Sequence, residues 1–332
     1  MTIDKRVFDK LSEAVGWTPL VKLHRSLGEL QCTAYAKIEF MNPMGSVKDR
    51  IARHMIQKAL QNEEIKAGDV IVENSSGNTA MGMAMMAACE GLKCKMVVRA
   101  STSKEKLDCL RAVGVDLCLV DGTLPPDHPE SYNRKAVLLA EEIPNSYYPD
   151  QHNNRENNRA HYETTGPEIW QQMDGRIDYF VAGIGTGGTI CGAGRYLKEQ
   201  DPNIKIVAVD PEGSVFYEYF KTGKVGKPGH YLLEGLGDEE IIKCPEFELI
   251  DEMVQISDKQ AFLSTRELAK SEAILAGGSS GAALYAVRQI AQRELAKGRK
   301  DLRLVTIFPD SGSRYLSTIF NDDWLREKGF IA

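Results

Sequence analysis

Residues 40–50 read FMNPMGSVKDR, a turn rich in proline, glycine and serine that carries one lysine, Lys48. The turn joins a strand-like apolar run, Ala34–Phe40, to a helical run that starts near Arg50. A lysine held in this way can act as a catalytic amine, because partial burial favours its neutral form. Most lysines that follow turns are simply solvated, so Lys48 by itself does not decide the function.

Three further turns are rich in glycine and serine: NSSGNT at 74–79, GIGTGGT at 183–189 and GGSSG at 277–281. Each follows an apolar run and opens a helix-like segment. The N-terminus of a helix presents unpaired N–H groups and a partial positive charge, and glycines let that backbone close on an anion. One such turn is usually a tight connection. Three of them together with Lys48 predict a ligand with several anionic or polar corners and a carbonyl group for the lysine.

Length and composition exclude several classes of protein. The chain has 332 residues, 42% of them apolar and 27% charged, as in soluble globular proteins, and the length suits two domains or one large α/β unit. The net charge of −6 argues against nucleic acid as a partner. No apolar run approaches the roughly 18 residues of a membrane helix. The polar first ten residues are unlike a secretory signal, so we expect a cytoplasmic protein.

Cysteine and histidine spacing offers no metal site. The seven cysteines form no C-x-x-C pair, and the six histidines form no H-E-x-x-H motif. We therefore expect reduced cysteines and no bound metal.

Strand-like and helix-like runs alternate along the chain, which predicts mostly parallel sheets covered by helices. The expected strands are 34–40, 69–73, 95–98, 115–120, 178–182, 205–210 and 302–308. The first expected helix starts near residue 50. The others are expected at 78–89, 103–113 with Ser103 as N-cap, 132–142, 156–173, 189–199, 259–272, 282–294 and 312–321. Residues 121–130 and 221–230 are expected to be loops. Ligands of such folds bind at the carboxyl ends of strands, where we expect all three glycine turns.

The second turn comes close to a dinucleotide fingerprint. It lacks the acidic residue about 20 positions further on that would bind a ribose, and its threonines favour a lone phosphate. An NAD-dependent oxidoreductase is therefore the weaker interpretation.

The four motifs, in this order, resemble the cysteine synthase / cystathionine β-synthase family, whose members are pyridoxal-phosphate (PLP) enzymes of fold type II, the tryptophan synthase β class. The resemblance extends from VGWTPL at 15–20 to PDSGSRYL at 309–316. DQ at 150–151, AHYETT at 160–165, VDPEGS at 209–214 and EGLG at 234–237 look closer to cystathionine β-synthase. TGPEIW at 165–170 looks more like bacterial cysteine synthases.

The resemblance implies an α/β fold of two three-layer domains with mostly parallel sheets. The smaller domain would comprise residues 1–12 and 36–152 and would carry Lys48 and the substrate carboxylate loop. The larger would comprise 13–35 and 153–332 and would carry the PLP phosphate loop. The expectation is a catalytic core, without the haem segment and regulatory module of the animal cystathionine enzymes, acting as a homodimer on small amino-acid substrates.

The resemblance also implies roles for individual residues. Lys48 would be the catalytic Schiff-base lysine, Asn78 would bind the 3′-oxygen of PLP, and Ser279 would contact the pyridine nitrogen. The residues that would hold the phosphate are Gly185, Thr186, Gly187, Gly188 and Thr189. Those that would bind substrate are Ser75, Ser76, Asn78 and Thr79 at the α-carboxylate, with Gly77 in the same turn, and Gly235 and Gly237 at the substrate mouth. His152 is also expected among the substrate-binding residues.

Two positions depart from the family's pattern. His152 stands where the family has tyrosine or another aromatic residue, and it is either a harmless polar replacement or the sign of a changed second-substrate pocket. Arg99 stands where the family usually has methionine. It is either an exposed arginine or an added contact for an anionic substrate.

The implied reaction is β-replacement on L-serine or an O-activated L-serine through an aminoacrylate, with a sulfur nucleophile, giving L-cysteine or L-cystathionine. A serine at the pyridine nitrogen need not protonate the ring, which favours elimination over long-lived carbanion chemistry. One alternative keeps this first half-reaction, with O-phosphoserine as donor, and uses an amino-acid amine as nucleophile, giving a diaminopropionate-type siderophore precursor. A non-enzymatic alternative is a PLP-binding regulatory scaffold.

Overall fold

The computed structural model describes residues 7–124 and 128–332, so part of the expected loop 121–130 lies outside the described residues. The chain divides into two compact units. Unit 1 consists of residues up to Gly16 and Met41–Asp150, and unit 2 consists of Trp17–Phe40 and Gln151–Ala332. These limits lie a few residues from the predicted domain boundaries.

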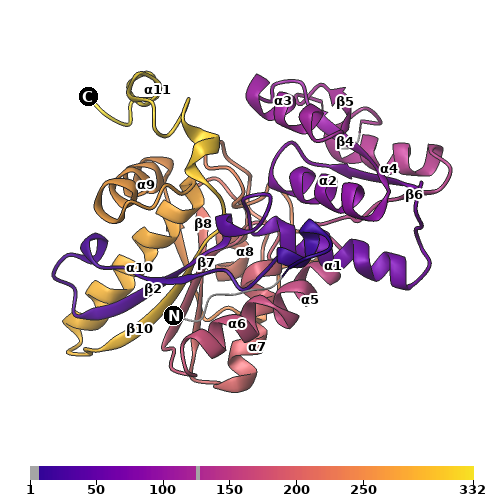
Figure 1. Ribbon diagram of the computed structural model, residues 1–332. Helices are drawn as coiled ribbons and strands as arrows, with labels where there is room; N and C mark the ends of the chain where they lie inside the picture. Colours follow the sequence, from indigo (N-terminus) through magenta and orange to yellow (C-terminus); the bar gives the residue numbers. More distant parts are fainter. Residues whose placement is uncertain (1–6, 125–127) are drawn as a thin grey trace. The chain divides into compact units, whose positions relative to one another are not determined.

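Unit 1 contains a four-stranded parallel sheet in the order β5-β4-β3-β6 (Figure 1). Its strands are β3 (Val70–Asn74), β4 (Lys93–Arg99), β5 (Asp116–Val120) and β6 (Ser146–Tyr147). Its helices are α1 (Lys48–Gln61), α2 (Asn78–Glu90), α3 (Lys104–Ala112) and α4 (Tyr132–Glu142). The expected N-cap of α3 is confirmed, because Ser103 Oγ accepts a hydrogen bond from the backbone N–H of Lys106.

Unit 2 contains a six-stranded sheet in the order β1-β2-β10-β7-β8-β9, parallel except for β1. Its strands are β1 (Leu20–Lys22), β2 (Cys32–Ile38), β7 (Tyr179–Gly183), β8 (Lys205–Pro211), β9 (Glu252–Ile256) and β10 (Leu302–Phe308). Its helices are α5 (Glu156–Glu163), α6 (Thr165–Gln172), α7 (Gly188–Gln200), α8 (Phe216–Thr222), α9 (Asp258–Glu272), α10 (Gly278–Ala296) and α11 (Asp322–Glu327). Short 3-10 turns occur at Leu11–Ala14, Arg25–Leu27, Glu39–Met41, Phe247–Leu249 and Gly312–Tyr315.

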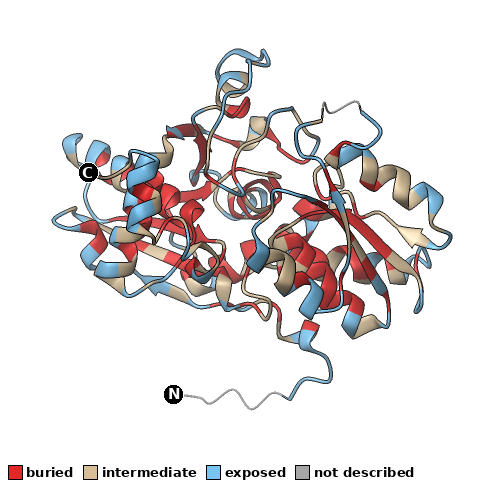
Figure 2. Ribbon diagram, turned by 90° about the horizontal axis from the view of Figure 1, so that it is seen from above, coloured by how far each residue is buried: buried red, intermediate tan, exposed pale blue. Residues whose placement is uncertain are grey.

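The central strands of unit 2 are buried on both faces (Figure 2). Leu304 and Phe308 of β10 join one apolar cluster with α9 and α10, whereas Val305 and Ile307 join a second cluster with α6, α7 and α8. Successive side chains of a strand point to opposite faces, so both faces of this sheet carry helices. This is the three-layer arrangement that the alternating runs predict.

The expected helix 156–173 is wrong as a single element, because it breaks at Thr164 into α5 and α6. A continuous helix would place Pro167 in its interior, where proline removes a backbone hydrogen bond and clashes with the preceding turn. In the structure Pro167 lies in the first turn of α6, where that N–H would be unpaired anyway. Thr164 Oγ1 donates to the carbonyl of Ala160 at 2.6 Å at the break.

The expected helix 312–321 is also wrong, since only Gly312–Tyr315 is helical, as a 3-10 turn. Asn321 instead caps the following helix, α11, through hydrogen bonds from the N–H groups of Asp323 and Trp324. The third glycine turn does not leave a strand, because it follows α9 and forms the first turn of α10. Strands β1, β6 and β9 and helices α8 and α11 were not predicted.

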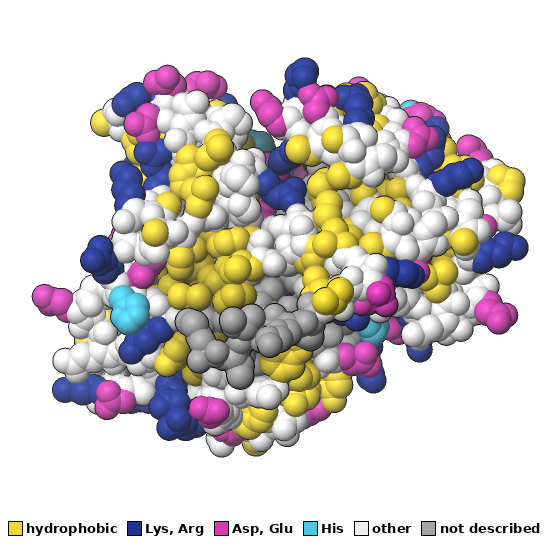
Figure 3. All heavy atoms as spheres, in the orientation of Figure 1, with side chains coloured by type: hydrophobic (Ala, Val, Ile, Leu, Met, Phe, Trp, Pro, Cys, Tyr) yellow, Lys and Arg dark blue, Asp and Glu magenta, His cyan; other side chains and the backbone are white. Residues whose placement is uncertain are grey.

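The surface carries mixed charge and the cysteines are reduced. Figure 3 shows basic and acidic side chains interspersed over one face of the molecule. None of the seven cysteines is in a disulfide, and burial raises the pKa of the Cys94 and Cys191 thiols to about 12, so both stay protonated. Within residues 7–124 and 128–332, no three His, Cys, Asp or Glu side chains are grouped to hold a metal, and no helix is long and apolar enough to cross a membrane.

A buried ion pair joins β2 to α6 in unit 2. Lys37 Nζ lies 2.8 Å from Glu168 Oε2, and both side chains are almost completely buried. Lys37 also donates to the carbonyl of Thr18 at 2.8 Å and to Gln172 Oε1 at 3.0 Å. Removing one partner of such a pair leaves an uncompensated buried charge.

We therefore expect Lys37→Met to lower the free energy of unfolding by about 3–5 kcal/mol. The double variant Lys37→Met/Glu168→Gln should recover much of this loss, because it also removes the buried carboxylate that Lys37 had balanced. Urea unfolding followed by circular dichroism measures both. A Lys37→Met loss below about 1 kcal/mol, the size typical of surface pairs, would contradict this account.

Candidate active site

The turn that carries Lys48 is fixed by its own polar groups. Gly45 has a φ of +81°, a conformation that suits glycine, and its N–H donates to the carbonyl of Asn42 at 2.9 Å. Asn42 Nδ2 donates in turn to the carbonyl of Ser46 at 3.1 Å. These bonds close the turn just before Lys48, the half-buried first residue of α1.

The first glycine turn lies between β3 and α2 in the same unit. Ser75 Oγ accepts hydrogen bonds from the N–H groups of Gly77 and Ala80, each at 3.3 Å, and this fixes the loop. A Cβ on Gly82, one turn into α2, would lie 2.9 Å from Ala52 Cβ and 3.1 Å from the carbonyl oxygen of Lys48. Helix α2 thus packs against the start of α1, so unit 1 brings the turn at 75–79 and Lys48 into the same region.

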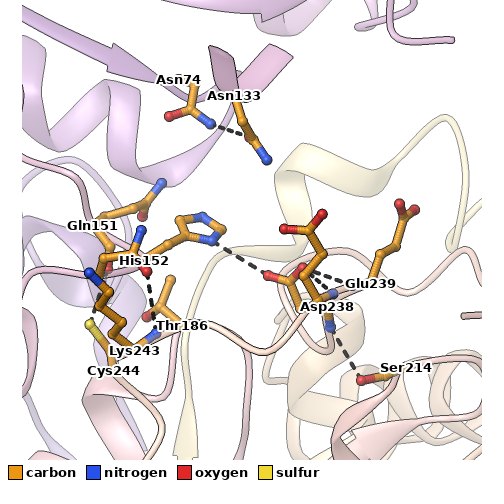
Figure 4. A network of polar contacts seen from close by, with 12 residues as sticks. Asn74, Asn133, Gln151, His152, Thr186, Ser214, Asp238, Glu239, Lys243 and Cys244 are labelled. Atoms are coloured by element: carbon orange, nitrogen blue, oxygen red, sulfur yellow. Dashed lines mark hydrogen bonds and ion pairs between the residues drawn. The ribbon is translucent and has the colours of Figure 1, made fainter. Parts of the chain in front are cut away.

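Polar side chains hold this loop at its strand end. Asn74 Nδ2 donates to Asn133 Oδ1 at 2.8 Å (Figure 4), and the hydroxyl of Tyr148 donates to Asn74 Oδ1 at 3.1 Å. Burial, reinforced by the charge of Glu73, raises the pKa of Tyr148 far above its ordinary value. The phenol therefore stays protonated and remains a donor.

Arg99 is the last residue of β4 and is exposed. Its guanidinium carbon is 4.7 Å from the centre of the Tyr132 ring, a cation–π contact. The aliphatic part of its side chain packs over Gly122, where an added Cβ would lie 3.1 Å from Arg99 Cδ. No carboxylate in the described part of the chain forms an ion pair with Arg99. The stacking fixes the side chain and leaves its charge available to an anion.

The second glycine turn, in unit 2, permits close approach of backbone to backbone. Gly187 has a φ of +83°, and a Cβ there would lie 2.7 Å from the Cα of Pro245. A Cβ on Gly185 would collide with the carbonyl oxygen of Gly235, and a Cβ on Gly188 would collide with Asn157 Oδ1. The space at these three positions is therefore filled by neighbouring protein, which explains the glycines without reference to a ligand.

The same turn leaves backbone donors for an anion. Among the described residues of this segment, Cys191 is the first whose N–H makes a helical hydrogen bond. It donates to the carbonyl of Gly187 at 2.9 Å. The preceding N–H groups, from Gly185 to Ile190, sit at the positive end of the 13-residue helix α7. This donor set fits a phosphate.

Two residues of α5, Asn157 and His161, support the turn from behind and were not predicted from the sequence. Asn157 Nδ2 donates to Thr186 Oγ1 at 3.0 Å, and His161 Nε2 lies 3.2 Å from Thr189 Oγ1. Residues four apart share one face of a helix, and both side chains are completely buried. Because Asn157 occupies an acceptor site of the Thr186 hydroxyl, the hydroxyl hydrogen remains free to donate to an anion.

The third glycine turn lies beside the carboxyl end of β10, although it follows a helix. The Gly277 N–H donates to the carbonyl of Asp310 at 3.0 Å, and β10 is the direct neighbour of β7 in the sheet. Ser279, in the first turn of α10, is 7% exposed, and its hydroxyl has no hydrogen-bond partner among the described residues. Unit 2 therefore places the second and third turns at adjacent strand ends.

The predicted substrate-mouth residues of unit 2 are attached to the same edge. Gly235 and Gly237 have φ angles of +81° and +70°, and the Gly237 N–H donates to the carbonyl of Ile184 at 2.8 Å. His152 is half-buried, and its Nδ1 lies 3.5 Å from Asp238 Oδ2 (Figure 4).

The profile of the family described as "Pyridoxal-phosphate dependent enzyme" matches residues 11–310. The chain belongs to the pyridoxal-phosphate dependent enzyme family. A cystathionine beta-synthase of Apis mellifera is 42% identical over 98% of this chain and 64% of its own length. A cysteine synthase of Staphylococcus aureus is 42% identical over 93% of this chain and 96% of its own length.

A solved structure gives a similar result. The O-acetylserine dependent cystathionine beta-synthase of Helicobacter pylori is 37% identical and covers 94% of this chain and 98% of its own, with a TM-score of 0.84. This similarity confirms the predicted fold type II. The chain spans less than two thirds of the length of the Apis relative, 64%, and of the Mus musculus cystathionine beta-synthase, 58%.

The described residues fit PLP, the cofactor of this family. The free N–H groups and threonine hydroxyls of the turn at 185–189 suit a phosphate, and the open hydroxyl of Ser279 suits a ring nitrogen. Lys48 begins a helix in the region of the turn at 75–79 within unit 1. The roles of these residues toward PLP and substrate are proposals that the following experiments test.

Asn157→Asp should weaken PLP binding by about tenfold or more. A carboxylate cannot donate to Thr186 Oγ1, so the hydroxyl would turn its hydrogen toward the new carboxylate and away from the phosphate, beside an added negative charge. Titration of apoenzyme with PLP, followed by absorbance, gives the dissociation constant.

The matched control is Asn154→Asp, three residues earlier. Asn154 Oδ1 accepts from the Glu156 N–H at 3.0 Å, a role that a carboxylate performs equally well, so the charge is added without loss of this bond. PLP affinity that falls equally in both variants would show that charge alone matters and that Asn157 does not orient Thr186.

Proposed function

We propose that this protein catalyses PLP-dependent β-replacement on L-serine or an O-activated L-serine, with a sulfur nucleophile, giving L-cysteine or L-cystathionine. The observation that carries the proposal is the neutral hydroxyl of Ser279 at the start of α10. This hydroxyl lies beside the end of β10, the direct neighbour of β7, and β7 leads into the phosphate-type turn, residues 185–189. A hydroxyl at the ring nitrogen leaves the ring less electron-withdrawing than a carboxylate partner would. This favours loss of a β-substituent over transamination.

The chain's own groups would divide the work. PLP, when bound, supplies the electron sink for charge that develops at the substrate Cα. The N–H groups and hydroxyls of residues 75–79 would bind the α-carboxylate, and Asn78 would donate to the 3′-oxygen of PLP. Lys48 Nζ would take the Cα proton as general base and return it after the nucleophile has added. The N–H groups of Gly185–Thr189 would hold the phosphate.

The test separates the two halves of the reaction. PLP-loaded protein is incubated with L-serine, O-acetyl-L-serine or O-phospho-L-serine, and exchange of the Cα proton in D₂O is followed by NMR. Hydrosulfide or L-homocysteine is then added, and the products are identified by mass spectrometry. We expect exchange and replacement with at least one donor, and Lys48→Ala should keep its circular dichroism spectrum and lose both. PLP-loaded protein without exchange for any donor would support the regulatory scaffold instead.

A second candidate, β-replacement on O-phosphoserine with an amino-acid amine, is favoured by Arg99, since no carboxylate in the described residues neutralises its charge. Arg99→Met should lower kcat/KM for O-phosphoserine by roughly tenfold to a hundredfold, the effect of about 1.5–3 kcal/mol for one charge-assisted bond, and should spare serine. Arg134→Met, which removes another exposed arginine of unit 1, is the control. An equal effect of Arg99→Met on every donor would make Arg99 a surface charge.

The proposal includes a cytoplasmic homodimer, as the family resemblance implies. Light scattering coupled to size-exclusion chromatography measures the mass in solution directly, against the 36.9 kDa of one chain.

A further inference from the structure

His152 and Asp238 form an imidazole–carboxylate pair in unit 2. The distance between His152 Nδ1 and Asp238 Oδ2 is 3.5 Å, and the two side chains are 35% and 21% exposed (Figure 4). The pair is therefore reachable from solvent without being fully solvated. At this distance the two groups are in ion-pair contact, and a hydrogen bond between them would need a small approach, of the kind that substrate binding brings about in active sites.

Asp238 is held so that one oxygen faces the histidine. Its Oδ1 accepts hydrogen bonds from the N–H groups of Glu239 at 2.7 Å and Glu240 at 3.2 Å, and its own N–H donates to Ser214 Oγ at 3.2 Å. With Oδ1 occupied, Oδ2 is the oxygen available to His152. A carboxylate placed in this way can orient an imidazole.

Both partners are tied to the phosphate-type turn. The carbonyl of Gln151, directly before His152, accepts from Asn157 Nδ2 at 2.7 Å, and the same amide group reaches Thr186. Gly237, directly before Asp238, donates to the carbonyl of Ile184 at 2.8 Å. The His152 carbonyl also accepts from the Cys244 N–H at 3.2 Å. The pair therefore has a fixed position at the edge where unit 2 carries its glycine turns.

Building on the proposed β-replacement, we propose that His152, oriented by Asp238, is the general base that deprotonates the incoming nucleophile. With Nδ1–H directed at Asp238, Nε2 is the acceptor, and it has no partner in the described part of the chain. The β-substituent has already left Cβ when the nucleophile arrives. The S–H or N–H bond of the nucleophile breaks, its proton passes to Nε2, and its electron pair forms the new bond to Cβ. The Cα–Cβ π bond breaks in the same step, and its electron pair becomes available at Cα for a proton. Lys48 returns the proton to Cα, and His152 then releases its own proton to solvent.

This role predicts the class of acceptor. A thiol or an ammonium group arrives protonated and needs a base, whereas hydrosulfide arrives as an anion and needs none. The pair therefore favours an organic thiol or amine as the natural second substrate. A tyrosine or other aromatic residue, which the family resemblance implies at this position, could not accept the proton in this way near neutral pH.

The experiment compares two acceptors on PLP-loaded enzyme, with O-acetyl-L-serine as donor. His152→Phe should slow transfer to L-homocysteine by roughly 100-fold, the lower range for general base catalysis, and should affect transfer to hydrosulfide far less. Imidazole added to His152→Ala should restore part of the lost rate with homocysteine, in a saturable manner. His24→Phe, at an exposed histidine whose backbone contacts Glu272, is the control for loss of a surface imidazole.

Asp238→Asn gives a readout other than turnover. An amide can donate to Nδ1 and so favour the opposite tautomer, with the proton on Nε2. Two-bond ¹H–¹⁵N NMR of the holoenzyme should show His152 with the proton on Nδ1 in the wild type and on Nε2 in Asp238→Asn, together with slow transfer to homocysteine.

Other results would overturn the proposal: equal losses on homocysteine and hydrosulfide, no loss on either, or a wild type that accepts only hydrosulfide. Exchange of the Cα proton, measured on the same variants, separates this failure from failure of the proposed function. If exchange is present and the acceptors are not distinguished, β-replacement stands and the general-base role falls. If exchange is absent from the wild type as well, the proposed function itself is wrong.

Discussion

The phosphate-type turn at 185–189 depends on close packing of backbone, and much of unit 2 is arranged around it. A side chain on Gly185, Gly187 or Gly188 would meet Gly235, Pro245 or Asn157. The segment 235–245 and helix α5 can therefore approach β7 and α7 only because these positions lack a Cβ. The same contacts fix the N-terminus of α7, whose N–H groups we propose as the phosphate site.

Two pairs of polar side chains are attached to this part of unit 2 in different ways. The turn is backed by an amide and an imidazole, Asn157 and His161, whose nitrogens lie within hydrogen-bond distance of the hydroxyls of Thr186 and Thr189. His152 directly follows Gln151, whose carbonyl accepts a hydrogen bond from Asn157. Asp238 directly follows Gly237, whose N–H donates to the carbonyl of Ile184. Through the backbone, one packed framework holds both the turn that we propose for the cofactor phosphate and the histidine that we propose as proton acceptor.

The sequence was sufficient for the fold class and for most elements. Alternation of apolar runs predicted mostly parallel sheets, and the limits of α4 and β10 agree with the predicted 132–142 and 302–308. The split between α5 and α6 was missed because apolar periodicity continues across Thr164, and only Pro167 signals the break. Strand β9 is five residues long and carries Glu252 and Gln255, so its apolar pattern is too short to stand out.

The sequence predicted those candidate site residues that belong to a local backbone motif. It did not predict residues whose place in the site depends on tertiary contacts. The glycine turns and Lys48 were found because strand–turn–helix segments have a local signature. Asn157 and His161 were not found, because their spacing looks like that of any helix face until α5 is packed against α7. The carboxylate partner of His152 lies 86 positions away along the chain, so no local pattern connects the two.

The central claim is that this chain binds PLP through Lys48, and reduction of the holoenzyme with borohydride tests it most directly. Borohydride fixes the pyridoxyl group on the lysine that holds it, and peptide mapping by mass spectrometry identifies that lysine. The account predicts one modified peptide, with the pyridoxyl group on Lys48. A pyridoxyl group on any other lysine, or none on a protein saturated with PLP, would contradict it.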